Sequence, residues 1–163
     1  MGGTENHLDR RDVDTVIGRY QKRVREYGLG DASLSSGSDA KQRARHEVHA
    51  GALRGENPRV LDIGCGLGAF YQFLQKTGRS ARYTGYDLVP EYVDACRAAF
   101  TDATFEGRNF FEDGIDGEFD TVVMSQVLNN RYSHSDNLKV MENAMRGAFA
   151  AAKVSVSIDM MSS

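Results

Sequence analysis

The sequence of 163 residues predicts one α/β domain of three layers, in which helices cover both faces of a mostly parallel sheet. Short apolar segments alternate with segments of helical periodicity, as parallel strands joined by helices require. Segment 119–125 is an almost continuous apolar run, which is typical of a strand buried on both faces. A glycine-rich turn at 64–68 stands between a strand pattern and a helix pattern, where doubly wound sheets bind their ligands.

The N-terminal part of the chain is expected to be helical. Apolar residues recur at helical spacing over 13–27, and Gly28 ends that helix. A second, charged helix is expected over 39–53, and the proline that follows ends the pattern. We therefore divide the chain into a helical cap or lid, residues 1–57, and a ligand-binding domain, residues 58–163.

The remaining elements alternate between strand and helix. Five strands are expected, over residues 60–62, 81–87, 103–108, 119–125 and 154–160. Three helices are expected between them, over residues 69–75, 90–100 and 136–150. The last helix carries an apolar stripe that should face the sheet, formed by Leu138, Met141, Met145 and Phe149.

Composition excludes several classes of function. The net charge is −3 and no block of lysine and arginine is interleaved with aromatic residues, so nucleic acid is not an expected partner. No apolar segment is long enough to span a membrane, and the polar N-terminus lacks the apolar core of a signal peptide. Two cysteines do not make a disulfide framework, so we expect a cytoplasmic protein.

The turn at 64–68 has the spacing G-x-G-x-G, and Asp62 stands two residues before its first glycine. A dinucleotide-binding turn has the spacing G-x-G-x-x-G, with a pyrophosphate at the helix N-terminus. A carboxylate at position 62 would repel that pyrophosphate but would attract an amine-bearing ligand. The glycines themselves indicate that the backbone approaches the ligand closely.

Residues 62–68 resemble the first motif, D-x-G-x-G-x-G, of the class I S-adenosylmethionine-dependent methyltransferases, and they match it in full. The resemblance implies a Rossmann-like methyltransferase fold with S-adenosylmethionine as the cofactor. It also implies that the turn holds this cofactor, through Asp62, Gly64, Cys65, Gly66 and Gly68. Residues 125–131 and 159–163 further resemble a group of small bacterial methyltransferases.

An acidic residue ends the second expected strand. Asp87 lies about 20 residues beyond the glycine turn, the offset at which a carboxylate meets a ribose in dinucleotide-binding sheets. The family resemblance implies that Leu88 packs on the adenine. Asp87 would suit NAD equally well, so an NAD-dependent oxidoreductase stays open as an alternative. A carboxylate that only caps the helix beginning near Pro90 is the other alternative.

The end of the third strand is expected to complete the adenine pocket. Asn109 matches the position where the family often has an aspartate that accepts from the adenine amine, and an asparagine oxygen can accept the same bond. Phe110 is expected to wall the pocket. The register leaves Arg108 or Phe110 open as the occupant of that position, and the aromatic residues here could instead be ordinary core.

The loop after the fourth strand, which begins at Ser125, is expected to border the transferred methyl group. Methyl transfer from a sulfonium is an in-line displacement, in which alignment alone can contribute roughly 7–11 kcal/mol. A base is needed only where the acceptor must lose a proton, and His134 is the catalytic candidate. The alternative is that His134 and the nearby Asp136 only mark the beginning of the last helix.

Two features of the N-terminal helices leave alternatives open. If these helices form a lid, Tyr20, Lys41 or Arg43 could reach the carboxylate of the methionine moiety. His46 and His49 are three residues apart and lack the i, i+4 spacing of a zinc site. A solvated helix face is therefore the preferred interpretation of the two histidines, and no metal is expected.

Class I methyltransferases usually have seven strands, whereas this chain supplies five. The domain is thus expected to be truncated after strand 154–160, whose open edge would favour self-association. The expected function is S-adenosylmethionine-dependent methyl transfer to a small-molecule acceptor. A cofactor-binding module without activity in this truncated form is the alternative from a different class.

Overall fold

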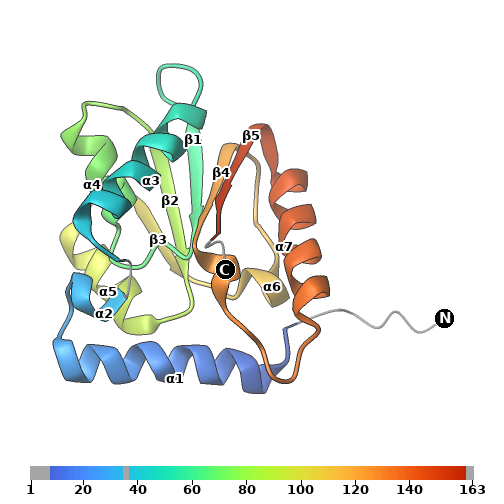
Figure 1. The fold of residues 1–163 in the computed structure, drawn as a ribbon. Coiled ribbons are helices and arrows are strands. Elements are labelled where there is room, and N and C mark those ends of the chain that lie inside the picture. The colour runs from blue at the N-terminus through green and yellow to red at the C-terminus, as the bar shows by residue number, and fades with distance from the viewer. Residues whose placement is uncertain (1–7, 35–36, 161–163) are drawn as a thin grey trace.

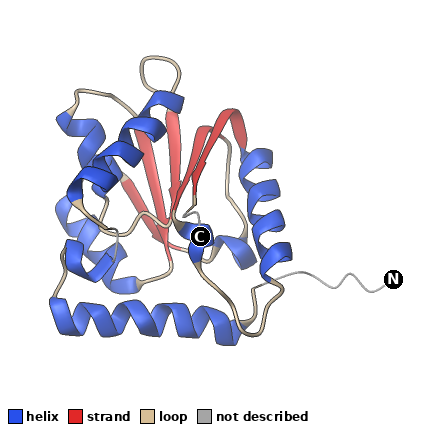
Figure 2. Ribbon diagram, in the orientation of Figure 1, coloured by secondary structure: helices blue, strands red, loops and turns tan. Residues whose placement is uncertain are grey.

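Five parallel strands form a twisted sheet with helices on both faces (Figures 1 and 2). The computed structural model describes residues 8–34 and 37–160. The strands are β1 (Arg59–Ile63), β2 (Arg82–Asp87), β3 (Thr104–Gly107), β4 (Phe119–Ser125) and β5 (Ala152–Asp159). The helices are α1 (Arg10–Tyr27), α2 (Asp31–Leu34), α3 (Asp39–Ala52), α4 (Ala69–Lys76), α5 (Pro90–Ala99), α6 (Phe110–Asp113), the 3-10 turn η1 (Val127–Asn129) and α7 (Asn137–Ala151). The predicted three-layer α/β/α fold is confirmed.

The strand order determines which edge of the sheet can hold a ligand. The order is β3-β2-β1-β4-β5, so the chain builds outward from β1 in one direction and then returns to the other side of β1. All four strand pairs are parallel, and Asp62 of β1 lies opposite Gly85 of β2 and Val123 of β4. The carboxyl ends of β1 and β4 therefore form the switch point at which open α/β sheets bind ligands.

Alternate residues of the central strands pack into two cores, one on each face of the sheet. Val60 and Val123 pack on one face with residues of α3, α4 and α5. Leu61 and Met124 pack on the other face with residues of α6 and α7. Because β4 is covered on both faces, its sequence is almost continuously apolar, as predicted.

Helix α1 lies along the carboxyl edge of the sheet rather than on either face (Figure 1). Its first turn contains Asp12, a buried carboxylate. This carboxylate accepts the backbone N–H groups of Ser133 and His134 at 3.0–3.3 Å and the hydroxyl of Ser135 at 2.7 Å. One end of α1 is thus tied to the loop that follows β4.

The buried face of α7 differs from the predicted one. The prediction placed Leu138, Met141, Met145 and Phe149 against the sheet, but Leu138 and Phe149 are 68% and 62% exposed. The buried residues are Val140, Ala144, Ala148 and Ala151. Small side chains four residues apart let the helix approach the sheet closely, and dense packing there excludes the larger residues. The periodicity of large apolar residues alone therefore pointed to the wrong face.

Several shorter features complete the fold. The helices α2 and α6 and the turn η1 were not predicted. Strand β5 pairs only with β4 within the described residues. Across those same residues, no helix is long and apolar enough to cross a bilayer. Residues 161–163, which contributed to the resemblance with small bacterial methyltransferases, lie outside the described ranges.

Candidate functional site

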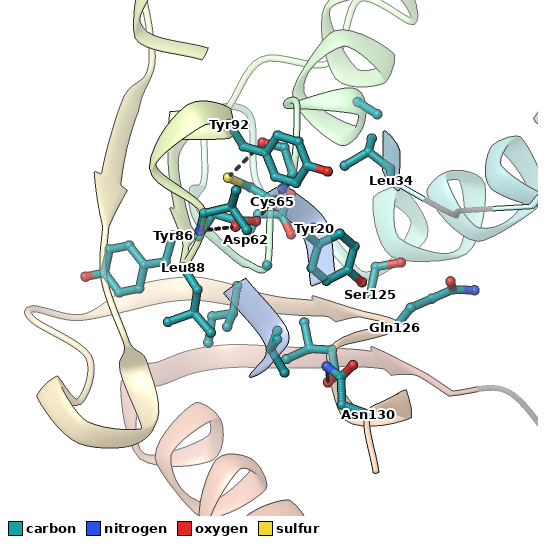
Figure 3. Close-up of a pocket in the computed structure, with 18 of the residues that line it drawn as sticks. Tyr20, Leu34, Asp62, Cys65, Tyr86, Leu88, Tyr92, Ser125, Gln126 and Asn130 are labelled. Atoms are coloured by element: carbon teal, nitrogen blue, oxygen red, sulfur yellow. Dashed lines mark hydrogen bonds between the residues drawn. The ribbon is translucent and has the colours of Figure 1, made fainter. Parts of the chain in front are cut away.

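A cavity of about 540 Å³ opens at the carboxyl edge of the sheet, between the glycine turn, the ends of β2 and β4, and helices α1 and α3 (Figure 3). Small-molecule sites usually occupy about 300–1,000 Å³, so the cavity is large enough for a nucleoside-sized ligand. Eight of the ten predicted cofactor-binding residues line it: Asp62, Gly64, Cys65, Gly66, Asp87, Leu88, Phe110 and Ser125. Gly68 and Asn109 do not.

The glycines of the turn have two different roles. Gly64 and Gly66 line the cavity with φ angles of +73° and +55°. A Cβ on Gly64 would lie 2.5 Å from a valine methyl of η1, and one on Gly66 would lie 2.8 Å from Leu34. Gly68 precedes α4, where a Cβ would lie 2.8 Å from the ring of Phe100. The first two glycines therefore keep the cavity open, and the third allows α4 to pack.

Asp62 is a buried carboxyl group beside the turn. It is 3% exposed, and the hydroxyl of Tyr83 donates a hydrogen bond to it. Burial raises the pKa of Asp62 to about 7, although the bond from Tyr83 acts in the opposite direction. A cationic group in the cavity would favour the charged form of this carboxyl, so the site is suited to an ammonium-bearing ligand.

Asp87 connects the end of β2 to the glycine turn. One of its oxygens accepts the N–H of Gly66 at 2.8 Å, and the other accepts the N–H of Val89 at 2.9 Å. Burial raises the pKa of Asp87, while the backbone hydrogen bonds lower it. Asp87 and Leu88 both line the cavity, so a carboxylate and an apolar side chain face the same region.

The segment after β3 lines the cavity with Phe110, as predicted, but not with Asn109. Arg108, Phe110 and Phe111 line it, whereas Asn109 does not. Asn109 precedes α6, its amide donates to Glu112 at 3.3 Å, and its Oδ1 is buried without a partner among the described residues. The two alternatives that the register left open, Arg108 and Phe110, are thus the residues that face the cavity.

The end of β4 forms a polar wall. Ser125 and Gln126 line the cavity together with Asn129 and Asn130 (Figure 3). Gln126 has a φ of 59°, and it is the one non-glycine residue with positive φ in the described part of the chain. A left-handed residue of this kind costs about 1–3 kcal/mol, and such residues concentrate at functional sites.

His134 lies outside the cavity lining and is exposed. Its backbone N–H donates to Asp12, and two residues later Asp136 accepts from the N–H groups of Leu138 and Lys139 at 3.1 and 3.2 Å. Asp136 therefore caps α7, and the structure has the helix boundary that was the alternative reading of this segment. A catalytic role for His134 remains a prediction.

Helix α1 forms the roof of the cavity. Tyr20, Arg19 and Arg23 line it. The ring of Tyr20 packs edge-on against Tyr92, with centroids 6.1 Å apart, and Arg19 donates to Asn130 across the cavity mouth. The arginines of α1 were missed because an amphipathic pattern shows which face is apolar but not which polar residues meet a ligand.

Of the three residues predicted to reach from the lid, only Tyr20 lines the cavity. Lys41 and Arg43 are exposed and do not line it. Arg43 pairs with Glu47 on the outer face of α3 at 3.1 Å. The cation that α3 directs toward the cavity is Arg45 instead.

The inner face of α3 contradicts the solvated-face interpretation of its histidines. His46 is 9% exposed and lines the cavity, and His49 is 1% exposed behind it. Burial lowers the pKa of His46 to about 4, so its imidazole is neutral at pH 7. Their three-residue spacing, continued by the apolar Ala50, was the signal for an inward face. No group of three or more His, Cys, Asp or Glu residues in the described ranges could hold a metal ion.

Comparison with solved structures agrees with the fold. The N-methyltransferase NodS from Bradyrhizobium japonicum, in complex with S-adenosyl-L-homocysteine, superposes with a TM-score of 0.62. The similarity covers 82% of this chain and 67% of NodS at 18% identity. At this level of identity the comparison supports the architecture alone.

Two curated relatives are similar to about half of this chain. A fatty-acid O-methyltransferase of Mycolicibacterium smegmatis is 38% identical over 80 residues, which are 48% of this chain and 28% of the relative. Rv1506c of Mycobacterium tuberculosis, also named as a methyltransferase, is 36% identical over 81 residues, 47% of this chain and 46% of the relative. The chain thus spans less than half the length of these curated relatives.

A family model described as a methyltransferase domain matches residues 60–148, which is more than half of the chain. The match begins in β1, includes the glycine turn and the end of β2, and ends within α7. The chain therefore belongs to the methyltransferase domain family.

Proposed function

We propose that this chain binds S-adenosylmethionine and transfers its methyl group to a small-molecule acceptor. The observation that carries the proposal is that two carboxyl groups, the buried Asp62 and the half-buried Asp87, stand on either side of one glycine turn in a cavity of about 540 Å³. The NodS structure with bound S-adenosyl-L-homocysteine lends support, since the two chains share the fold.

The lining fits the chemical groups of this cofactor. Asp62 is suited to the ammonium group, and the carboxylate of Asp87 is suited to the ribose hydroxyls. Leu88 and Phe110 offer apolar surface to the adenine, and Arg108 supplies a planar cation beside it. With the adenosine over β2 and β3, the sulfonium end lies over β1 and β4, where Ser125 forms the wall.

The bound cofactor supplies an electrophilic methyl group, and the residues of the chain align the acceptor with it. Alignment is the main requirement of an in-line displacement. His46 is a neutral imidazole on the cavity wall, so it can accept a hydrogen bond from an acceptor group, but its pKa of about 4 makes it a weak base for removing a proton. A carboxylate acceptor, as the name of the M. smegmatis relative implies for that protein, needs no base.

The NAD-dependent alternative is disfavoured by charge. A pyrophosphate at the glycine turn would lie beside Asp62, and the like charges would repel, whereas Asp87 would suit the ribose of either cofactor. Calorimetric titration with S-adenosylhomocysteine and with NAD tests this point. Binding of NAD, without binding of S-adenosylhomocysteine, would overturn the proposed function.

A binding module without activity is the second candidate, because within residues 8–34 and 37–160 β5 pairs on one side only, and the chain spans less than half of its curated relatives. Methyl-transfer assays with carboxylate and amine acceptors, on this chain and on a form extended at its C-terminus, test activity. Binding without turnover in both forms would favour the module.

We further propose that residues 1–57 act as the cap of residues 58–163, since α1 and α3 both contribute to the cavity wall. The open edge of β5 is proposed to mediate self-association. A cytoplasmic location and the absence of a nucleic-acid partner are proposed from the cysteine content and the net charge of −3.

A further inference from the structure

A polar network lies behind the cavity wall, where α3 meets the end of β5. The Nδ1 atom of His49 is 2.7 Å from the hydroxyl of Ser157, and its Nε2 atom is 3.2 Å from Oδ1 of Asp159. Arg45 lies on the other side of the same carboxylate, with Nε 3.6 Å from Oδ2. Asp159 is thus held between a fully buried imidazole and a guanidinium that lines the cavity.

The carboxylate of Asp159 also accepts a hydrogen bond from the turn after β4. Oδ1 of Asp159 accepts the backbone N–H of Gln126 at 3.1 Å, and the backbone carbonyl of Asp159 accepts that N–H at 3.3 Å. The side chain of Ser125 also hydrogen-bonds to Asp159. The parallel register places Ser125 opposite Asp159, which brings these groups together at the strand ends.

Gln126 is the residue that needs this support. Its φ and ψ of 59° and 11° lie in the left-handed region, which a residue with a side chain adopts at a cost. The N–H that enters the bond to Asp159 belongs to this strained residue itself. Loss of the carboxylate would remove the shorter of the two hydrogen bonds that this N–H donates and leave the longer one, to the backbone carbonyl of Asp159, so the turn would be held less firmly.

We propose that Asp159 and His49 are positioning residues, which hold the Ser125–Gln126 turn at the end of the cavity where the methyl group meets its acceptor. The buried imidazole of His49 orients the carboxylate of Asp159, and the carboxylate fixes the turn. Neither residue lines the cavity, so both act through Ser125 and Gln126. This inference rests on the proposed function, because that function places the methyl group over β1 and β4.

The test compares two ligands that differ only in the methyl group and its charge. S-adenosylmethionine and S-adenosylhomocysteine are titrated by calorimetry into the 163-residue chain, and the ratio of their dissociation constants is the measurement. Asp159→Ala is expected to weaken S-adenosylmethionine about tenfold and S-adenosylhomocysteine much less, as for a lost hydrogen bond to a charged group. Asp159→Asn and His49→Gln keep an acceptor and a donor, and are expected to restore most of the ratio.

A second measurement follows the turn itself through the amide resonance of Gln126, and it requires no ligand. In the wild type, the amide resonance of Gln126 is expected to shift with pH as the carboxylate of Asp159 titrates, and Asp159→Asn should abolish this shift. Asp120→Ala is the matched control, since Asp120 accepts the backbone N–H of Arg59 at 2.7 Å at the opposite end of the sheet.

The outcomes distinguish a failure of the proposed function from a failure of the positioning role alone. Wild-type protein that binds neither ligand overturns the proposed function. Wild-type protein that binds both, with a folded Asp159→Ala variant that keeps the wild-type ratio and an unmoved Gln126 amide, overturns the positioning role alone. If the Asp120→Ala control changed the ratio as much as Asp159→Ala did, a general loss of sheet stability would explain the effect, and the positioning role would fail.

Discussion

At the scale of single residues, the two carboxyl groups beside the glycine turn differ in what they bind. Asp87 is already engaged by two backbone N–H groups, whereas Asp62 accepts a hydrogen bond from the hydroxyl of Tyr83. Asp87 therefore organises the turn as well as facing the ligand, and Asp62 is the acid whose charge depends on what occupies the cavity.

Asp87→Ala is expected to weaken binding of S-adenosylhomocysteine by one to two orders of magnitude, about 1.4 kcal/mol for each tenfold change. The variant removes both the ribose acceptor and the bond that holds the Gly66 N–H. Calorimetry measures the loss, and Asp94→Ala, an exposed acid on the following helix, serves as the control. Wild-type affinity in a folded Asp87→Ala protein would contradict the assignment of the cavity.

Gly66→Val is expected to abolish binding. The added side chain would meet Leu34 and would require a positive φ of 55°. Gly78→Val is a matched control, because Gly78 also has a positive φ, of 69°, but has open space around its Cα. Binding that survives Gly66→Val, with circular dichroism unchanged, would remove the turn from the site.

Asp62 predicts a pH dependence of ligand binding. Its folded-state pKa of about 7 exceeds the ordinary value of 3.8, so it stabilises the ligand-free fold fully below pH 3.8 and loses that contribution as the pH rises through 7. An ammonium-bearing ligand favours the carboxylate, so binding at pH 6 should release a proton and binding at pH 9 should not. Calorimetry in buffers of different ionisation enthalpy measures this.

Two variants check the origin of that proton. Asp62→Asn should eliminate the release at pH 6. Tyr83→Phe removes the hydrogen bond that lowers the pKa of Asp62, so the release should extend to higher pH. Proton uptake, or a release that Asp62→Asn leaves intact, would assign the titration to another group.

At the scale of elements, α7 shows how a helix is positioned by its smallest residues. Ala144 and Ala148 are 2% and 0% exposed, so neither site has room for a larger side chain. Ala148→Leu is expected to destabilise the protein by about 1–3 kcal/mol through overpacking, whereas Leu138→Ala on the exposed face should change stability by less than about 0.5 kcal/mol. Thermal unfolding of the two variants measures the difference, and equal effects would contradict the assignment of the faces.

The sequence predicts the site best where local chemistry is unambiguous. Asp62 and the first two glycines were identifiable because a strand, an acid and a glycine turn occur in one short segment. Asn109 does not line the cavity because it directly precedes a four-residue helix, too short to leave a periodic pattern, and its amide donates to Glu112 of that helix. The same pattern analysis could not locate Arg45, since its place on the cavity wall depends on contacts of α3 with distant elements, whereas the spacing of His46 and His49 did indicate an inward face.

Element boundaries and types were therefore easier to predict than element faces. Strand β4 follows from an apolar run that needs cover on both sides, and the other strands follow from short apolar or alternating segments between the helix patterns. Which side of α3 and of α7 is buried depends on the side chains of the sheet against which each helix packs. His49 of α3 is an example, because its polar partners are more than a hundred positions away in the sequence. Long-range pairing of this kind leaves no local signal.

At the scale of the whole molecule, the described sheet ends at β5, and Val154 is 56% exposed there. Unpaired backbone groups on such an edge favour pairing with a second strand. Self-association is expected to increase with concentration in light scattering, and Val154→Lys should reduce it by placing charge on the edge. A monomer at all concentrations, in both proteins, would show that the edge is protected by other means.

The placement of α1 also governs how quickly a bound molecule can leave. The helix crosses the mouth of the cavity and is tied at one end through Asp12 and, near its other end, through Arg23, which donates to the carbonyls of α2. We expect exit to require that such a tie open, so the residence time of a bound ligand should depend on α1 as well as on the residues that contact the ligand. Loosening Asp12 would then shorten residence while leaving the contacts made by Asp62 and Asp87 in place.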